Sequence, residues 1–229
     1  MKTLDLFSGI GGFSLGLEGA GFTTEAFCEI DPYARKVLSK HWPNKVIHTD
    51  VKELHIKEGE FEVICGGFPC QDISSSGKGE GLQGARSGLW GEYKRLIKEG
   101  MPNYVIIENV AALRSRGLAQ VLKDLWEVGY DAEWHIISAS CIGAPHQRER
   151  LWIVAYPHSS QCERGSISRR IQEKITNLSH LRWGEDKPRV VRTLNGVPFQ
   201  MDRLRCLGNA VVPLIPYIIG LSIQEERKK

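Results

Sequence analysis

The chain has 229 residues, of which 41% are hydrophobic and 25% charged, and its formal net charge is +3. This length allows one full α/β domain with its own core, and the composition is that of a soluble globular protein. We expect no apolar run that crosses a bilayer and no signal peptide. The six cysteines form no CxxC pair, so we expect neither disulfides nor a metal site, and a reducing cytoplasm is the simplest setting.

Short apolar runs alternate with helical segments over most of the chain. Regular alternation of this kind predicts a doubly wound sheet with helices on both faces. In chain order we expect a strand at 3–7, a helix at 13–20, strands at 23–28, 46–47 and 62–65 with a helix at 32–40 between the first two, a helix at 89–98, a strand at 104–107, a helix at 118–128, strands at 134–138 and 151–155, and a closing helix at 211–223.

The alternation stops after residue 157. Residues 158–200 are polar, carry eight Lys or Arg against four acids, and predict a small irregular insert. A basic segment beside a nearly neutral body suggests a polyanionic partner, although a solvated loop has the same composition. We therefore expect a catalytic domain at 1–157 that is completed by 201–229, with the insert between these two parts.

Acidic and glycine residues follow the first three expected strands. The first loop carries glycines in an order other than GxGxxG, and Asp5 precedes them, which favours a ligand with an amine or hydroxyls over a phosphate. Glu29 ends the second strand, where an acid typically binds ribose hydroxyls. Asp50 ends the third strand and could accept a hydrogen bond from an adenine amino group. Together these positions suit S-adenosyl-L-methionine, a nucleoside that carries a positively charged amino-acid group.

Cys70 stands just after the fourth expected strand, in the stretch Gly66–Gln71. Ligands bind at the carboxyl ends of the strands in such sheets. Pro69 stiffens the backbone that presents the thiol, and a thiolate is a strong side-chain nucleophile. A buried structural cysteine is the alternative interpretation, and the neighbouring motifs favour the nucleophile.

Seven short motifs occur along the chain: DLFSGIGG at 5–12, EID at 29–31, DV at 50–51, GFPCQ at 67–71, ENV at 108–110, QRER at 147–150 and GNAV at 208–211. In kind and order they resemble the motifs of the DNA (cytosine-5) methyltransferase family. The resemblance implies a Rossmann-like, S-adenosylmethionine-dependent fold, a location in the cytoplasm on double-stranded DNA, no membrane, and a restriction nuclease as a candidate companion.

The resemblance also implies roles for individual residues. Cys70 would add to carbon 6 of cytosine, Glu108 would bind ring nitrogen 3, and Arg150 would hold the base carbonyl with support from Arg148. The implied cofactor-binding residues are Phe7, Ser8, Gly9, Gly11, Gly12, Glu29, Ile30, Asp50, Val51, Pro69, Leu89, Asn209 and Val211. The target base must leave the duplex to react, so 71–88 is expected to be a mobile loop. The expected DNA-binding residues are Gln71, Ser74, Lys78 and Arg86 in this loop and Arg169 and Arg170 in the insert.

One feature departs from the family pattern. The family places a large target-recognition domain between the QRER and GNAV motifs, where this chain has only the 43 residues at 158–200. The departure puts sequence specificity and unaided activity in doubt. A cytosine-5 methyltransferase acting on tRNA and a non-catalytic nucleic-acid-binding partner stay open as alternatives. The glycine order and Cys70 disfavour a nucleotide-dependent oxidoreductase.

Overall fold

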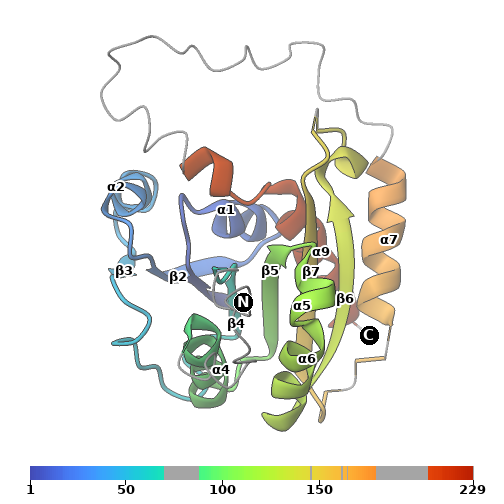
Figure 1. The fold of residues 1–229 in the computed structure, drawn as a ribbon, viewed down its shortest axis with the longest axis horizontal. Coiled ribbons are helices and arrows are strands. Elements are labelled where there is room, and N and C mark those ends of the chain that lie inside the picture. The colour runs from blue at the N-terminus through green and yellow to red at the C-terminus, as the bar shows by residue number, and fades with distance from the viewer. Residues whose placement is uncertain (70–87, 145, 161, 164, 179–205, 229) are drawn as a thin grey trace.

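A computed structural model describes residues 1–69, 88–144, 146–160, 162–163, 165–178 and 206–228 of the chain. These residues contain a seven-stranded sheet with the order β3-β2-β1-β4-β5-β7-β6 (Figure 1). The first five strands pair in parallel, whereas β7 is antiparallel to both β5 and β6. The strands are β1 (Lys2–Leu6), β2 (Thr23–Cys28), β3 (Val46–His48), β4 (Val63–Gly66), β5 (Tyr104–Val110), β6 (Tyr130–Ser138) and β7 (Glu149–Pro157).

Helices cover both faces of the sheet, which confirms the predicted doubly wound α/β architecture (Figure 1). One face packs against α1, α7 and α9, and the other against α4, α5 and α6. Val105, Ile106 and Ile107 are fully buried because successive side chains of β5 point to opposite, covered faces. The helices are α1 (Gly12–Gly19), α2 (Pro32–His41), α4 (Leu89–Gly100), α5 (Leu113–Arg116), α6 (Leu118–Glu127), α7 (Ser166–Leu178) and α9 (Leu214–Glu226), with a 3-10 turn η3 at Ala139–Ile142.

The first part of the expected irregular insert is helix α7. The carboxylate of Glu133 in β6 accepts hydrogen bonds of 2.8 Å from the main-chain nitrogens of Gly165 and Ser168, and thereby satisfies donors at the start of this helix. Ile167 and Ile171 are buried against the sheet. Residues 166–178 therefore belong to the body of the domain, and 179–205 lie outside the described residues.

Helix α7 is also joined to α9 by charge pairs. Arg170 of α7 contacts Glu226 at 3.1 Å and Glu225 at 3.4 Å, both in α9. Arg227, which follows Glu226 in the chain, contacts Glu62 just before β4. These contacts lie at the amino ends of the parallel strands, opposite the edge that carries the sequence motifs. Arg170 is thus engaged within the fold, which differs from the expectation that it holds DNA phosphate.

The expectation that no apolar run is long enough to span a bilayer was wrong for the closing helix. Residues Cys206–Glu226 are long and apolar enough to span a bilayer by length and composition, with a mean hydropathy of 1.8. In this fold, however, Ile215, Ile219 and Ile223 are buried in the core against the sheet and α1. Gly16 of α1 lets the two helices approach closely, because a β-carbon there would collide with the carbonyl oxygen of Pro213. α9 is therefore a core helix here.

Replacing Arg170 by Ala should lower the free energy of unfolding by roughly 2–3 kcal/mol, because it removes a cation from a buried carboxylate. The side chain of Glu226 is only 5% exposed. The matched control Arg169→Ala breaks an exposed pair with Glu163 and should cost less than about 1 kcal/mol. Urea denaturation followed by circular dichroism measures both values. Equal losses in the two variants would contradict the docking of α7 on α9.

Candidate active site

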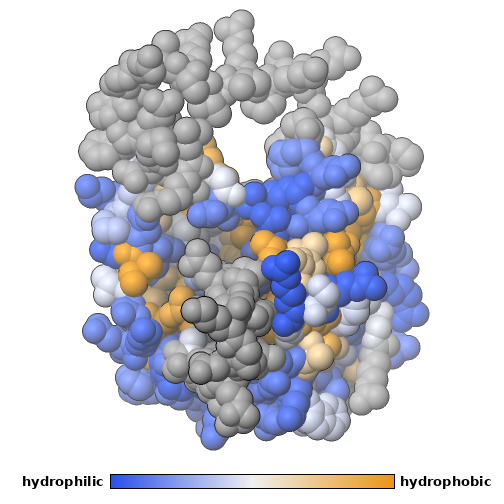
Figure 2. Space-filling model, viewed as in Figure 1, coloured by the Kyte–Doolittle hydropathy of each residue, from blue (hydrophilic) through white to orange (hydrophobic). Residues whose placement is uncertain are grey.

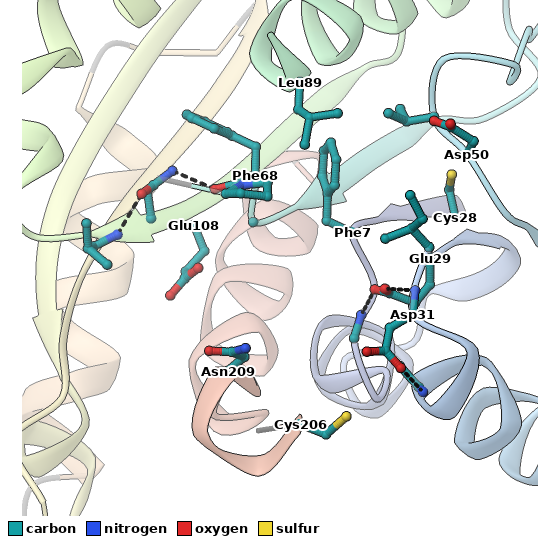
Figure 3. A pocket seen from close by; sticks show the side chains of 18 of the residues that line it. Phe7, Cys28, Glu29, Asp31, Asp50, Phe68, Leu89, Glu108, Cys206 and Asn209 are labelled. Atoms are coloured by element: carbon teal, nitrogen blue, oxygen red, sulfur yellow. Dashed lines mark hydrogen bonds between the residues drawn. The ribbon is translucent and has the colours of Figure 1, made fainter. Parts of the chain in front are cut away.

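A pocket of about 480 Å³ opens at the carboxyl edge of the sheet, where β1, β2, β4 and β5 end (Figure 3). Ligand sites in doubly wound sheets are expected at this edge. The predicted residues that line the pocket are Phe7, Gly9, Glu29, Ile30, Asp50, Val51, Pro69, Leu89, Asn209, Glu108, Arg148 and Arg150. The other lining residues are Cys28, Asp31, Ala34, Thr49, Gly67, Phe68, Asn109, Val110 and Cys206, which the site prediction did not include.

Glu29 organises one wall of the pocket. Its carboxylate accepts hydrogen bonds from the nitrogen of Gly9, at 2.6 Å, and from the nitrogen of Asp31, at 2.8 Å (Figure 3). Asp31 in turn caps α2 by accepting from the nitrogens of Tyr33 and Ala34. Each carboxylate oxygen can accept more than one hydrogen bond, so Glu29 can still receive a ligand hydroxyl.

Four predicted cofactor residues do not line the pocket but shape the glycine loop. Ser8 donates from its hydroxyl to the carbonyl oxygen of Asp5 at 2.6 Å. Gly11 has a φ of 86°, which favours glycine. A β-carbon on Gly12 would lie 2.6 Å from the carbonyl oxygen of Val211, so the loop and the GNAV motif touch here. These residues therefore act on the pocket through backbone geometry.

Asp5 is fully buried beneath the loop, which differs from the expectation that it faces a ligand amine. Its Oδ2 accepts from the hydroxyl of Ser14 at 2.7 Å and from the nitrogen of Ser14 at 3.3 Å, at the start of α1. Its Oδ1 has no hydrogen-bond partner among the described residues. Burial raises the pKa of Asp5 from 3.8 to about 8, against the opposing effect of the Ser14 hydrogen bonds.

Glu108 and Arg150 form the opposite wall. The Nε of Arg150 lies 2.8 Å from Oε1 of Glu108, whose side chain is only 13% exposed. Burial raises the pKa of Glu108, although the positive charges of Arg150 and Arg148 oppose the shift. A β-carbon on Gly67 would lie 2.7 Å from Oε2 of Glu108, so a larger residue there would displace this carboxylate. Figure 3 shows Glu108 directed into the pocket.

Asn109 is a site residue that the sequence prediction missed. Its side-chain nitrogen donates to the carbonyl oxygen of Phe68 at 3.0 Å, and its side-chain oxygen accepts from the nitrogen of Val110 at 2.9 Å. Asn109 is 3% exposed. It thus ties the end of β5 to the segment that leads to Cys70, and its place inside the ENV motif was the available signal.

Arg148 closes the pocket from the side of the GNAV motif. Its guanidinium donates to the carbonyl oxygens of Gly208, at 2.7 Å, and Ala210, at 2.9 Å. These two bonds hold Asn209, which lies between them, at the pocket. Arg148 has a φ of 34°, a conformation that is strained for a residue with a β-carbon. Arg148 therefore anchors the 208–210 turn, and its support of Arg150 at the base carbonyl stays a prediction.

Several predicted site residues lie outside the described residues. They are Cys70, Gln71, Ser74, Lys78 and Arg86. Pro69, which precedes Cys70, lines the pocket beside Phe68. The described part of the pocket therefore contains Glu108, Arg148, Arg150 and the wall around Glu29.

The mixed sheet, covered by helices on both faces and with a pocket at the carboxyl ends of its parallel strands, has the Rossmann-like fold of S-adenosylmethionine-dependent methyltransferases. Residues 1–196 match the family described as C-5 cytosine-specific DNA methylase, and the chain belongs to this family.

Similar proteins agree with this assignment. The type II methyltransferase M2.BsuMI of Bacillus subtilis is 39% identical over 68% of this chain and 42% of its own length. The type II methyltransferase M.CviJI of Paramecium bursaria Chlorella virus IL3A is 30% identical over 95% of this chain and 56% of its own length. The crystal structure of Spodoptera frugiperda DNMT2 shares the fold, with a TM-score of 0.58 at 20% identity over 70% of this chain and 51% of that chain. The chain thus spans about half the length of these relatives.

Asp5→Asn should remove a pH dependence from the stability of the fold. A carboxyl whose pKa is raised by folding stabilises the fold fully below its unfolded pKa and loses this contribution as the pH rises through the folded value. For Asp5 this window runs from 3.8 to about 8. The advantage of the variant over the wild type should therefore grow with pH, by at most about 1.4 kcal/mol per pH unit.

Urea denaturation at several pH values between 5 and 8 checks this expectation, with Glu58→Gln, an exposed carboxylate, as the control. Wild-type and Asp5→Asn stabilities that run parallel over this range would refute the assignment of a raised pKa to Asp5.

Proposed function

We propose that this protein is an enzyme that transfers a methyl group to carbon 5 of cytosine in duplex DNA. The observation that carries the proposal is the buried Glu108–Arg150 pair, which faces Gly67 on the segment that leads to Cys70. Membership of the C-5 cytosine-specific DNA methylase family supports it. The named relatives are type II methyltransferases, and a restriction nuclease as companion and a cytoplasmic location are parts of the same proposal.

Carbon 5 of cytosine is a weak nucleophile, so the proposed chemistry begins at carbon 6. Addition of the Cys70 thiolate there turns the ring into an enamine, in which carbon 5 can attack an electrophile. Cys70 directly follows Pro69, a lining residue, in the sequence.

Glu108 has the properties that the proposed acid needs. Because burial raises its pKa, its protonated form is more abundant near neutral pH than that of an exposed glutamate. That proton can be donated to ring nitrogen 3, which draws electrons away from carbon 6 and favours addition of the thiolate. Arg150, already beside Glu108, is in range to hold the base carbonyl.

The residues of the other wall fit S-adenosyl-L-methionine, which supplies an electrophilic methyl group when it is bound. Ile30 lines the pocket yet is 71% exposed, so a flat apolar ring would bury it favourably. Glu29 and Asp50 provide acceptors for ribose hydroxyls and an amino group. Phe7 packs against Tyr93, with ring centroids 6.2 Å apart, and this contact fixes the apolar side of the site.

The covalent step predicts a trapped adduct. A duplex in which every cytosine of one strand is 5-fluorocytosine covers any recognition sequence, and fluorine at carbon 5 cannot leave as a proton does. With S-adenosylmethionine present, the wild type should form a complex that survives denaturing electrophoresis, and Cys70→Ser should form none. Cys141→Ser, which removes an exposed free cysteine, is the matched control and should trap DNA like the wild type.

Two outcomes would overturn the proposal. One is an adduct that persists in Cys70→Ser, and the other is methylation of ordinary duplex DNA without any adduct on the fluorinated duplex. Methylation of tRNA with no reaction on duplex DNA would favour the RNA alternative.

A further inference from the structure

Two arginines on α5 are exposed and have no hydrogen bond or ion pair with the described residues. They are Arg114 and Arg116. The other arginines in the described ranges each pair with a carboxylate or donate to a main-chain carbonyl, namely Arg35, Arg95, Arg148, Arg150, Arg169, Arg170 and Arg227. The acids of the next helix are engaged elsewhere, because Asp124 and Glu127 both contact Lys94. The positive charge of α5 is therefore available to a partner.

The position of α5 ties this charge to the pocket. β5 carries Glu108, and Val110 at the end of β5 lines the pocket. α5 begins three residues later with Leu113, which is fully buried and anchors the helix in the core. Arg114 thus lies within roughly 14 Å of Val110, the most that four residues can span. Figure 1 shows α5 beside the end of β5.

An aromatic side chain on the edge strand β6 completes the surface. The guanidinium of Arg114 lies over the ring of Trp134, 5.9 Å from its centroid. Trp134 and Ile136 share one face of β6 by strand alternation, and each is 37% exposed. The next residue, Ile137, is opposite Arg150 in the sheet register, so this end of β6 lies beside the strand that carries Arg150, although the side chain of Ile137 points to the other face of the sheet. We call Arg114, Arg116, Trp134 and Ile136 the α5–β6 patch. Figure 2 shows hydrophilic and exposed apolar side chains side by side on this face.

We propose that the α5–β6 patch binds the DNA phosphates that flank the target cytosine. The inference rests on the proposed function. Guanidinium groups bind phosphate through paired N–H donors, and stacking on Trp134 orders Arg114 without using those donors. At about 3.4 Å of rise per nucleotide, the span of roughly 14 Å between Val110 and Arg114 corresponds to about four nucleotides, so a duplex whose base enters the pocket would bring nearby phosphates to the patch. The patch would supply position and affinity, because contacts to phosphate carry no sequence information directly.

The salt dependence of DNA binding tests the proposal. Duplex DNA of random sequence is titrated with the full chain at several salt concentrations, with fluorescence anisotropy as the readout. Each lost phosphate contact reduces the slope of log affinity against log salt by about 0.9. Arg114→Gln/Arg116→Gln should therefore flatten the slope by about 0.9–1.8. The matched control Lys98→Gln/Arg227→Gln removes the same charge near the amino ends of the parallel strands and should leave the slope nearly unchanged.

S-adenosylhomocysteine binding, measured by calorimetry, should be the same in all three proteins. A wild-type slope in the α5 variant, or equal flattening in both variants, would overturn the proposal while the methyltransferase function stands. A flattened slope for a tRNA transcript with none for duplex DNA would assign the patch to RNA and also overturn it. Failure of the wild type to bind or methylate any duplex DNA would remove the proposed function itself.

Discussion

A buried carboxylate at the end of β5 is the constraint on which the rest of the site depends. Glu108 emerges from a strand that is apolar on both faces, and a charge in such a place requires a cation. The antiparallel strand β7 supplies it, because its register with β5 places Arg150 opposite Val110, two residues beyond Glu108. Because β7 lies next to β5 in the strand order, Arg150 can pair with the buried Glu108.

The same strand positions the far side of the pocket. Arg148 directly precedes β7, and its guanidinium donates to the carbonyl oxygens of Gly208 and Ala210. These two hydrogen bonds hold Asn209 at the pocket. Asn109, next to Glu108, holds Phe68 in the segment that leads to Cys70. Asn109 thus connects β5 to the segment before Cys70, and Arg148 connects the start of β7 to the 208–210 turn. On the opposite wall Glu29 connects the glycine loop to α2, and Asp5 supports that loop from below.

Much of this arrangement could be predicted from the sequence, because alternating apolar runs and strand-end acids carry local signals. The strands and their catalytic edge follow from such patterns, and so does the pairing of Glu29 and Asp50 on one wall. Helix α7 could not be predicted in the same way. Its buried residues Ile167 and Ile171 stand in a polar, basic stretch, and its cap, Glu133, lies more than thirty residues earlier in the chain.

For a related reason, charge along the sequence did not show that Arg170 pairs with acids inside the fold. Arg170 contributes to a basic segment in sequence, but its partners Glu225 and Glu226 are visible only once α9 is placed. Asp5 is a second example. An acid beside a glycine loop can face either a ligand or the helix beneath the loop, and Asp5 faces Ser14 of α1. Only packing decides between these two positions.

The central claim is that one pocket at the carboxyl edge of the sheet brings a methyl donor and a cytosine together. The most direct test incubates the purified chain with duplex DNA and S-adenosylmethionine that carries a deuterated methyl group, followed by mass spectrometry of the digested nucleosides. We predict deuterated 5-methyl-2′-deoxycytidine as the product, and its loss in Glu108→Ala. Label on an exocyclic amino group of cytosine or adenine, or no labelled deoxynucleoside while tRNA is labelled, would contradict the account.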